Sequence, residues 1–496
     1  MKISIDKCVE TIKKKLHYGS DLKERRVQFF GRSISFLYIA DLTDMDIMNL
    51  NIIRPIVECE EQPSGKILDY ISQKVLTDNE LAVLQTENEA VEKILKGHVA
   101  IVIDKEEKLL SVNAEKIVVR AIETPPNSVV VKGPRQGFNE SLKYNLSLLR
   151  QRLATEQLVV KSLTLGRLTQ TQVAVCYLDN VADKNIVNDI ISKISSIDVD
   201  GIVDSSYIAS FLQRKPNSLF KQVGDTEKPD ILCSKLLEGR VGIIVDGSPI
   251  VLTLPFIIIE DLQNGDDYYS QHIRVTFIRI LRVVGIVLAV LLPGMYVALQ
   301  LYHYKILPLQ FLTTIMNTTQ GIPFNPFAEI MFVVLLFEVL YEANLRMPQY
   351  LGMALSIVGA LILGETAVNA GLVSPPAVMI VALSGLTFYV VPQQATQFAM
   401  LRLIFVVVGA VLGVFGILIG GVGVVSYLCS FDSYDSAYLG PLAPYIKNDQ
   451  KDFFMKVNQK SMYTRPASIA NNKNNLKRMS GEDKGAEKKR SGKCKK

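Results

Sequence analysis

The chain has 496 residues, 49% of them hydrophobic, and a formal net charge of +5 at pH 7. This length is too great for one ordinary core, so two or three domains are expected. Residues 1–276 carry 34 basic and 38 acidic side chains, which argues against nucleic acid as a partner, and the positive excess lies in residues 430–496.

The N-terminal part is expected to stay on the cytoplasmic side of a membrane. The opening sequence "MKISIDKCVETIKKKL" has no apolar stretch of the kind that a cleavable signal peptide requires. None of the six cysteines forms a CxxC pair, so reduced thiols are expected.

The hydrophilic part contains an internal repeat. The segment "ISFLYIADLTD" (34–44) resembles "VAVCYLDNVAD" (173–183), and "LKGHVAIVID" (95–104) resembles "LEGRVGIIVD" (237–246), at offsets of 139 and 142 residues. Each copy contains apolar, β-branched strands separated by a helical stretch. The repeat predicts two related α/β subdomains, at 1–124 and 154–270.

Residues 125–153 are interpreted as a connector that ends in a basic amphipathic helix. Asn139 is the expected N-cap of this helix. Its apolar stripe contains Leu142, Leu146, Leu149 and Leu153. The stripe packs either on its own domain or on a neighbouring subunit or acidic loop. The residues expected to couple the domains are Gly133, Pro134, Arg135, Gly137 and Asn139.

Residues 271–429 read as an α-helical, polytopic membrane domain. Only nine residues between Phe277 and Cys429 are charged. The five apolar segments are 277–300, 327–343, 349–370, 376–392 and 400–428. A membrane crossing needs about 20 residues, and the segment at 327–343 is the weakest because glutamates interrupt and flank it.

Charge predicts the orientation of this domain. Arg274, Arg279 and Arg282 place the start of the first segment inside, and the basic tail at 430–496, expected to be disordered, favours the same side. An even number of crossings follows. The simplest arrangement has four full spans, with 302–343, broken by three prolines, as a re-entrant or interfacial element.

Glutamates within apolar segments are the candidate functional residues. Glu338 and Glu342 share one helical face, as do Glu365 and Asn369. A carboxylate facing lipid costs about 2.5–3.5 kcal/mol, so these side chains should face a bundle interior, a subunit interface or water. A ring of such carboxylates would favour cations. The alternative for Glu342 is a boundary position paired with Arg346.

Small residues in the fifth segment predict close helix packing, within one subunit or between subunits. Gly409 and Gly413, then Gly416 and Gly420, form two Gly-x-x-x-Gly steps. As one continuous helix, the segment would be about 43 Å long. The sequence shows no catalytic constellation, metal-ligand spacing or cofactor motif, so no enzymatic activity is expected.

Several motifs in one order are similar to a known family. They include "KGPRQGFNESLKYNLSLLRQRL", "LEGRVGIIVDGSP", "LLPGMYVAL", "GIPFNPFAEIMFVVLLFEVLYEANLRMP", "IVGALILGETAVNAGLVSPPAVMIVAL" and "YLGPLAPY". Across residues 28–445 the chain resembles the A subunit of the GerA-type spore germination receptors.

The resemblance implies a receptor subunit in the spore inner membrane, with a cytoplasmic N-terminal domain. It implies a transporter-like, nutrient-binding B subunit and a lipoprotein C subunit as partners. It also implies that A subunits form a homo-oligomeric, nutrient-gated ion channel, passing monovalent cations and contacting lipid, that starts germination. The alternatives are a non-conducting membrane scaffold or the paralogous accessory subunit of the spore dipicolinate channel. A solo secondary transporter is disfavoured because no inverted repeat is visible.

Overall fold

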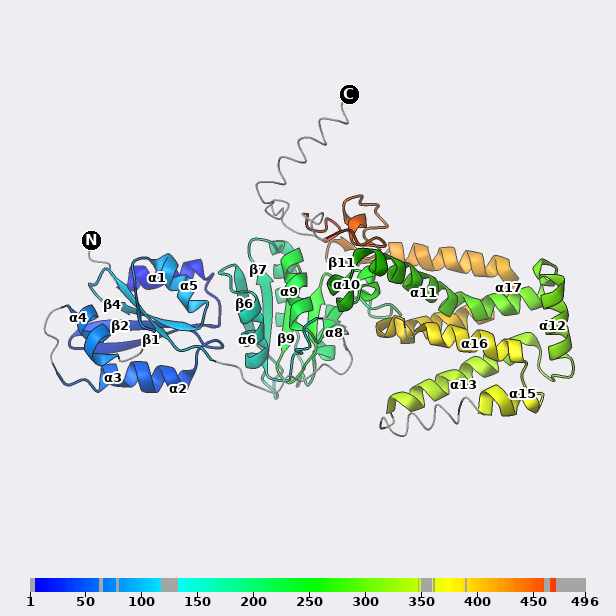
Figure 1. Ribbon diagram of the computed structural model, residues 1–496, viewed down its shortest axis with the longest axis horizontal. Coiled ribbons are helices and arrows are strands. Elements are labelled where there is room, and N and C mark those ends of the chain that lie inside the picture. Colours follow the sequence, from blue (N-terminus) through cyan, green and yellow to red (C-terminus); the bar gives the residue numbers. More distant parts are fainter. Residues whose placement is uncertain are drawn as a thin grey trace, which may run out of the picture.

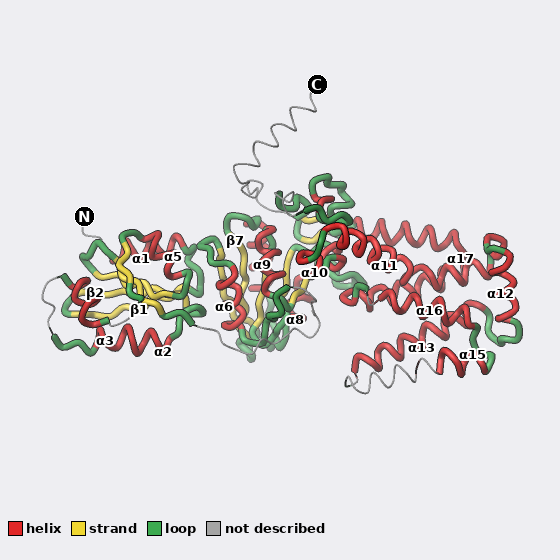
Figure 2. The backbone as a smooth tube through the Cα atoms, in the orientation of Figure 1, coloured by secondary structure: helices red, strands yellow, loops and turns green. Residues whose placement is uncertain are grey.

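The structure is a computed structural model that describes residues 5–61, 66–76, 80–116, 133–346, 348, 359, 362–388, 390–458 and 464–469. The chain builds an α/β part with strands and helices, followed by a part made of helices (Figure 2). The two parts lie at opposite ends of an elongated molecule (Figure 1). A small C-terminal segment lies where they meet.

The first subdomain is a five-stranded antiparallel sheet with helices on both faces. Its elements are α1 (Ile5–Lys15), β1 (Leu22–Phe29), β2 (Arg32–Ile39), α2 (Met45–Ile47), η1 (Met48–Ile53), α3 (Arg54–Val57), α4 (Ile67–Tyr70), η2 (Ile71–Val75), β3 (Ala82–Leu84), α5 (Glu87–Ile94), β4 (His98–Ile103) and β5 (Leu109–Asn113). The strand order is β1-β2-β4-β5-β3. One apolar core lies under α1 and α5, and another lies under η1, α3 and α4. All six residues of β4 are therefore buried.

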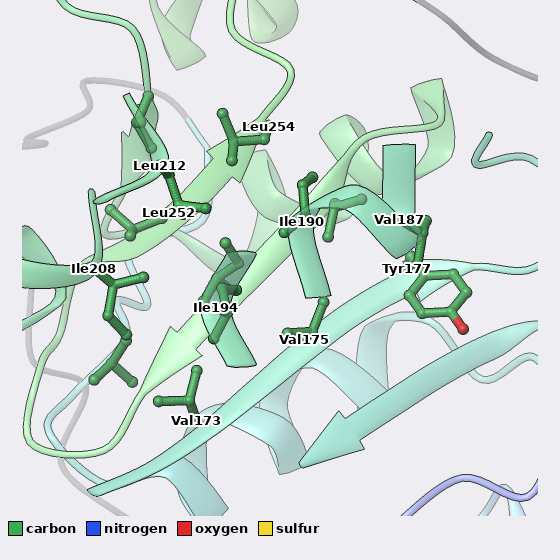
Figure 3. Packing of buried hydrophobic residues seen from close by; sticks show 14 of the residues in the cluster. Val173, Val175, Tyr177, Val187, Ile190, Ile194, Ile208, Leu212, Leu252 and Leu254 are labelled. Carbon is green, nitrogen blue, oxygen red and sulfur yellow. The ribbon is translucent and has the colours of Figure 1, made fainter. Parts of the chain in front are cut away.

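The second subdomain repeats this architecture. Its elements are α6 (Leu142–Arg152), β6 (Leu158–Leu165), β7 (Thr171–Leu178), α7 (Lys184–Ser195), α8 (Ser205–Leu212), β8 (Gly224–Thr226), α9 (Pro229–Glu238), β9 (Val241–Val245) and β10 (Val251–Leu254). The strand order is β6-β7-β9-β10-β8, which matches the first sheet position by position. Figure 3 shows how Ile190 and Ile194 of α7 pack over Val173 and Val175 of β7.

The helix at 142–152 belongs to the second copy of the repeat. Like α1 in the first copy, α6 precedes the first strand and covers one sheet face, together with α9. Its leucine stripe packs into this core, so the stripe contacts its own domain. The predicted connector at 125–153 thus contains the first helix of the second subdomain, and residues 117–132 lie outside the described part.

Asn139 is not the N-cap of α6, contrary to expectation. The helix begins after Ser141, and the N–H of Leu142 donates to the carboxylate of Asp246 at 2.9 Å. Asn139 instead accepts from the N–H of Ser141 and exchanges two hydrogen bonds with Asn145. A carboxylate after β9 thus satisfies a backbone donor that a local cap usually takes.

The helical part follows a short junction. The junction contains η3 (Ile258–Leu262) and α10 (Gly265–Tyr269). The helices are α11 (His272–Leu301), η4 (Tyr304–Ile306), α12 (Leu309–Thr319), α13 (Pro326–Arg346), η5 (Ile362–Thr366), α15 (Ala367–Asn369), α16 (Pro375–Phe388), η6 (Pro392–Gln394) and α17 (Ala395–Cys429). Helix α11 packs against α13, α16 and α17.

The fifth apolar segment is a helical hairpin and not a single long rod. Gly413 in α17 has φ 64° and ψ −157°, which breaks the helix. The hydroxyl of Tyr302 donates to the carbonyl of Ala410 at 2.8 Å, just before the break. Gly420 then packs against the ring of Phe405 from the first half. Each half is about 24–27 Å long, and the second half (orange) ends beside the start of α11 (Figure 1).

Two helices of the described part are long and apolar enough to cross a membrane by length and composition, His272–Leu301 and Pro392–Cys429. Helix α13 is also continuous over 21 residues, but it contains three glutamates. Helix α13 lies within the re-entrant or interfacial element predicted at 302–343, which stays a prediction. Pro326 is the first residue of α13, where proline is tolerated. The segment at 349–370 lies mostly outside the described residues.

The described part of the C-terminal segment is folded, which corrects the expected disordered tail for 430–458 and 464–469. It contains β11 (Asp432–Ser433), β12 (Ser436–Ala437) and η7 (Asp449–Lys451). Tyr434 and Tyr438 are buried. The hydroxyl of Tyr438 donates to the carbonyl of Lys221 in the second subdomain at 2.7 Å. Most basic residues of the predicted tail at 430–496 lie in residues 470–496, which are outside the described part.

Candidate functional site

A buried ionic network joins the junction before the helical part to α11 and to the C-terminal segment. Asp267 of α10 accepts from Arg279 at 3.0 Å and from Arg282 at 2.7 Å, both on α11. Arg279 is 2% exposed and also donates to Asp452 of the C-terminal segment at 2.9 Å. The amine of Lys456 donates to the backbone carbonyl of Asp267. Three separate pieces of chain are thus held by one set of charges.

A second ionic cluster lies close to this junction, in the second subdomain. Glu260 of η3 is paired with Arg240 and with Lys235, the latter at 2.8 Å. Burial alone would raise the pKa of Glu260, but the two cations outweigh it and hold the pKa at about 2. Glu260 therefore stays ionised at neutral pH and fixes η3 to the end of α9.

Of the predicted coupling residues, Gly133 lies against this junction. Gly133 has φ 117°, and a side chain there would meet the ring of Tyr269 in α10 at 2.6 Å. Gly137 is buried, Pro134 is half-buried and Arg135 is exposed. The turn thus follows the ring of Tyr269 closely, which requires glycine at Gly133.

The two α/β subdomains meet at a buried ion pair. Arg150 of α6 lies 2.7 Å from Asp21, and both side chains are 4% exposed. Beside them, Ser20 contacts strand β6, where its N–H donates to the carbonyl of Val160 at 3.0 Å. Arg150 therefore joins the two subdomains.

Glu338 is neutralised inside the helical part. It forms an ion pair with Arg402 of α17, whose side chain is 2% exposed. Arg402 also donates to the hydroxyl of Ser384 in α16 at 3.1 Å, and lies 4.5 Å from the ring centre of Phe388. The arrangement connects α13, α16 and α17. Because Arg402 balances the charge of Glu338, this carboxylate is not expected to attract a conducted cation.

Glu342, Glu365 and Asn369 all lie on the surface of the chain. Glu342 pairs with Arg346 at 2.6 Å, with both side chains exposed, as its alternative interpretation predicted. Glu365, in η5, and Asn369, at the end of α15, are also exposed. The four predicted residues therefore do not form one cluster. The exposed positions of Glu365 and Asn369 leave them free to face water, lipid or another chain.

Glu329 is the buried carboxylate that sequence reasoning did not select. Its side chain is 1% exposed, and it accepts a hydrogen bond from the N–H of Ser374, just before α16. Tyr296 of α11 lies beside it, and Gln300 of the same helix lies beside Tyr296. A signal was present, because Asn325 and Pro326 mark a helix start that puts Glu329 in its first turn.

The described residues contain no group of three or more His, Cys, Asp or Glu side chains that could hold a metal ion. The polar groups of the helical part are arranged as single carboxylates with arginine, hydroxyl or amide neighbours. Such an arrangement is suited to packing, to charge neutralisation and to contacts with small ions.

Comparison with known proteins identifies the family. The model of the Bacillus/Clostridium GerA spore germination protein family matches residues 10–468. Spore germination protein KA of Bacillus subtilis is 32% identical over 472 residues, which cover 94% of this chain and 87% of that protein. The membrane protein YfkQ of the same organism is 33% identical, over 91% of this chain and 88% of its own length.

The similar proteins also include another spore germination protein and one solved domain. Spore germination protein GerLA of Bacillus cereus is 29% identical, over 92% of this chain and 94% of its own length. The crystal structure of the N-terminal domain of the A subunit of the Bacillus megaterium germinant receptor GerK3 is 24% identical. It covers 51% of this chain and 96% of its own, with a TM-score of 0.41. The match over residues 10–468 shows that the chain belongs to the GerA spore germination protein family.

Proposed function

We propose that the chain is the A subunit of a nutrient receptor in the spore inner membrane, and that copies of it form a nutrient-gated ion channel. The observation that carries this proposal is the family match, which spans both the α/β part and the helical part. The partners are a transporter-like B subunit that binds the nutrient and a lipoprotein C subunit. The conducted ions are monovalent cations, and the helical part contacts lipid.

The proposed topology places the α/β part and the C-terminal segment on the cytoplasmic side. The start of α11 and residues 452–456 are bonded to each other, so both ends of the helical part lie on one side. An even number of crossings follows. Because α17 is a hairpin, its two halves count as two crossings. Helix α11 provides another, so the chain between α11 and α17, which includes α13 and α16, must supply an odd number.

Glu365 and Asn369 are the proposed pore-lining or gating residues. Both side chains are exposed on the single chain, and a symmetric oligomer would turn one exposed carboxylate into a ring of negative charge. Glu338 serves a different role in this proposal, because Arg402 neutralises it. Glu342 is expected to contribute little, since it pairs with Arg346 on the surface.

The experiment is nutrient-triggered ion release from spores whose receptor contains the Glu365→Ala variant. Slower potassium release at an unchanged protein level is the expected result. The control is Glu92→Ala, which removes an exposed carboxylate from α5 in the first subdomain. Release kinetics equal to wild type in Glu365→Ala would remove this residue from the gate.

Conduction itself is tested by single-channel recording. The purified chain, with its B and C subunits, is reconstituted in a planar bilayer and exposed to nutrient. Nutrient-dependent conductance supports the channel. A folded, silent complex would favour the non-conducting scaffold, and conductance of dipicolinate only with other channel components would favour the accessory subunit.

A further inference from the structure

Three helices enclose a polar cluster around Glu329. The carboxylate comes from the first turn of α13, Tyr296 and Gln300 come from the last two turns of α11, and Ser374 precedes α16. Glu329 is 1% exposed, Tyr296 is 5% exposed and Ser374 is fully buried. The Tyr296 hydroxyl lies beside Glu329, Gln300 and Ser374. We name these four residues the Glu329 cluster.

Several polar atoms of the Glu329 cluster are buried and make no hydrogen bond of regular geometry. They are the hydroxyl oxygen of Tyr296 and both amide atoms of Gln300. Buried polar groups in folded proteins are nearly always bonded, to protein or to a bound species. Tyr296 lies beside the carboxylate of Glu329 and Gln300 lies beside Tyr296, so these polar atoms are available to bind a common ligand.

The charge at this position is also unbalanced. Glu338, on the same helix, has Arg402 as a partner. Among the described residues, no Lys, Arg or His lies within ion-pair distance of Glu329, and its bonded neighbour is the uncharged N–H of Ser374. A carboxylate buried without a counter-charge is unfavourable, and a bound cation removes that cost.

We propose that the Glu329 cluster binds one monovalent cation, K⁺ or Na⁺. The ligands are the carboxylate of Glu329, the side-chain carbonyl of Gln300 and the hydroxyls of Tyr296 and Ser374. One carboxylate with neutral oxygens matches a single positive charge, whereas Ca²⁺ sites use more carboxylates and Zn²⁺ sites use His or Cys. The described residues contain no such group. The site does not depend on conduction, since a silent subunit could hold it equally well.

The test is cation-dependent stability of the purified full-length chain in detergent. Thermal unfolding is followed in potassium, sodium or N-methylglucamine chloride at constant ionic strength. A ligand that binds only the folded state raises Tm in a saturable way. The expected result is a saturable Tm rise of several degrees in K⁺ or Na⁺ over N-methylglucamine, lost in Glu329→Gln and reduced in Gln300→Leu.

The matched control is Glu342→Gln, which neutralises an exposed carboxylate on the same helix and should keep the cation response. If Glu329→Gln fails to give a monodisperse protein, Tyr296→Phe and binding of radioactive rubidium to the wild-type chain take its place. Identical Tm values in all three salts, or no competable rubidium binding, overturn the proposal. A response that persists in a folded Glu329→Gln protein overturns it as well. Channel recording is a separate measurement, so failure here leaves the proposed function standing.

Discussion

The guanidinium of Arg150 lies 2.7 Å from the carboxylate of Asp21, and this buried pair joins two copies of one α/β architecture. Arg150 belongs to α6 of the second copy, while Asp21 precedes β1 of the first. Arg150 also contacts the carbonyl of Thr155 in its own subdomain. The relative placement of the subdomains therefore rests on this charge pair together with the hydrogen bonds of Ser20 to strand β6.

Arg150→Ala is expected to destabilise the α/β part by about 3–5 kcal/mol, because it leaves Asp21 buried without its partner. Thermal unfolding of the purified chain measures this change. Arg152→Ala is the control, since Arg152 is exposed and bonds only Gln136 among the described residues. An unfolding temperature equal to wild type in Arg150→Ala would show that water replaces the pair at no cost.

Stability of the same interface should depend on pH through Asp41. Burial, with the charge of Asp21 second, raises the pKa of Asp41 from 3.8 to about 6, against the opposing effect of Lys143, Lys116 and Arg150. The folded state then binds more protons than the unfolded state between these values, so stability falls as pH rises through this window.

The Asp41→Asn variant removes the free-energy cost of burying an ionised carboxylate at this position. We expect a gain of up to about 3 kcal/mol at pH 7–8 that shrinks steadily toward pH 4. Tm of variant and wild type at several pH values measures it. A gain that is the same at pH 5 and pH 8 would exclude the titration of Asp41 as its cause.

Arg402 and Glu338 should be more costly to separate than to remove together. Arg402→Ala leaves an unpaired carboxylate among helices, at a cost of about 2.5–3.5 kcal/mol on insertion scales. The double variant Arg402→Leu with Glu338→Leu should recover most of the loss. Yield of monodisperse protein and Tm measure both, with Arg346→Ala as the exposed control. Equal losses in the single and double variants would contradict a paired role.

Gly409→Ala should loosen the contact between α11 and α17. A side chain at Gly409 would lie 2.4 Å from the carbonyl oxygen of Gly294, so the helices must shift, at a cost of about 1–3 kcal/mol. Gly421→Ala is the matched control in the same helix, because that position faces open space. Tm in detergent should fall for Gly409→Ala and hold for Gly421→Ala.

The sequence predicted those features that depend on local pattern. The repeat was visible because β2 and β7, like β4 and β9, are buried on both faces and so repeat an apolar run. The close approach at Gly409 followed from residue size alone. The cap of α6 could not be predicted, because its acceptor, Asp246, lies 104 residues away.

Long-range pairing and backbone conformation account for the other differences. Nothing in the sequence of α17 separates Gly413, with its positive φ, from the glycines that stay helical around it. Arg402 lies 64 residues from Glu338, so their pairing depended on the fold. Disorder was predicted for the whole tail because its last residues are rich in Lys and Arg. The residues between 430 and 458 have a different composition and include aromatic side chains that are buried.

The position of Asp452 and Lys456 sets an order of events during synthesis. Arg279 leaves the ribosome long before Asp452 does, and yet the two are bonded in the finished molecule. Until α17 and residues 452–456 have been translated, Arg279 lacks its bonds to Asp452, and the backbone carbonyl of Asp267 lacks its bond to Lys456. The joint between the α/β part and the helical part is thus completed last, and a chain truncated within α17 would lack the bonds that Asp452 and Lys456 make there.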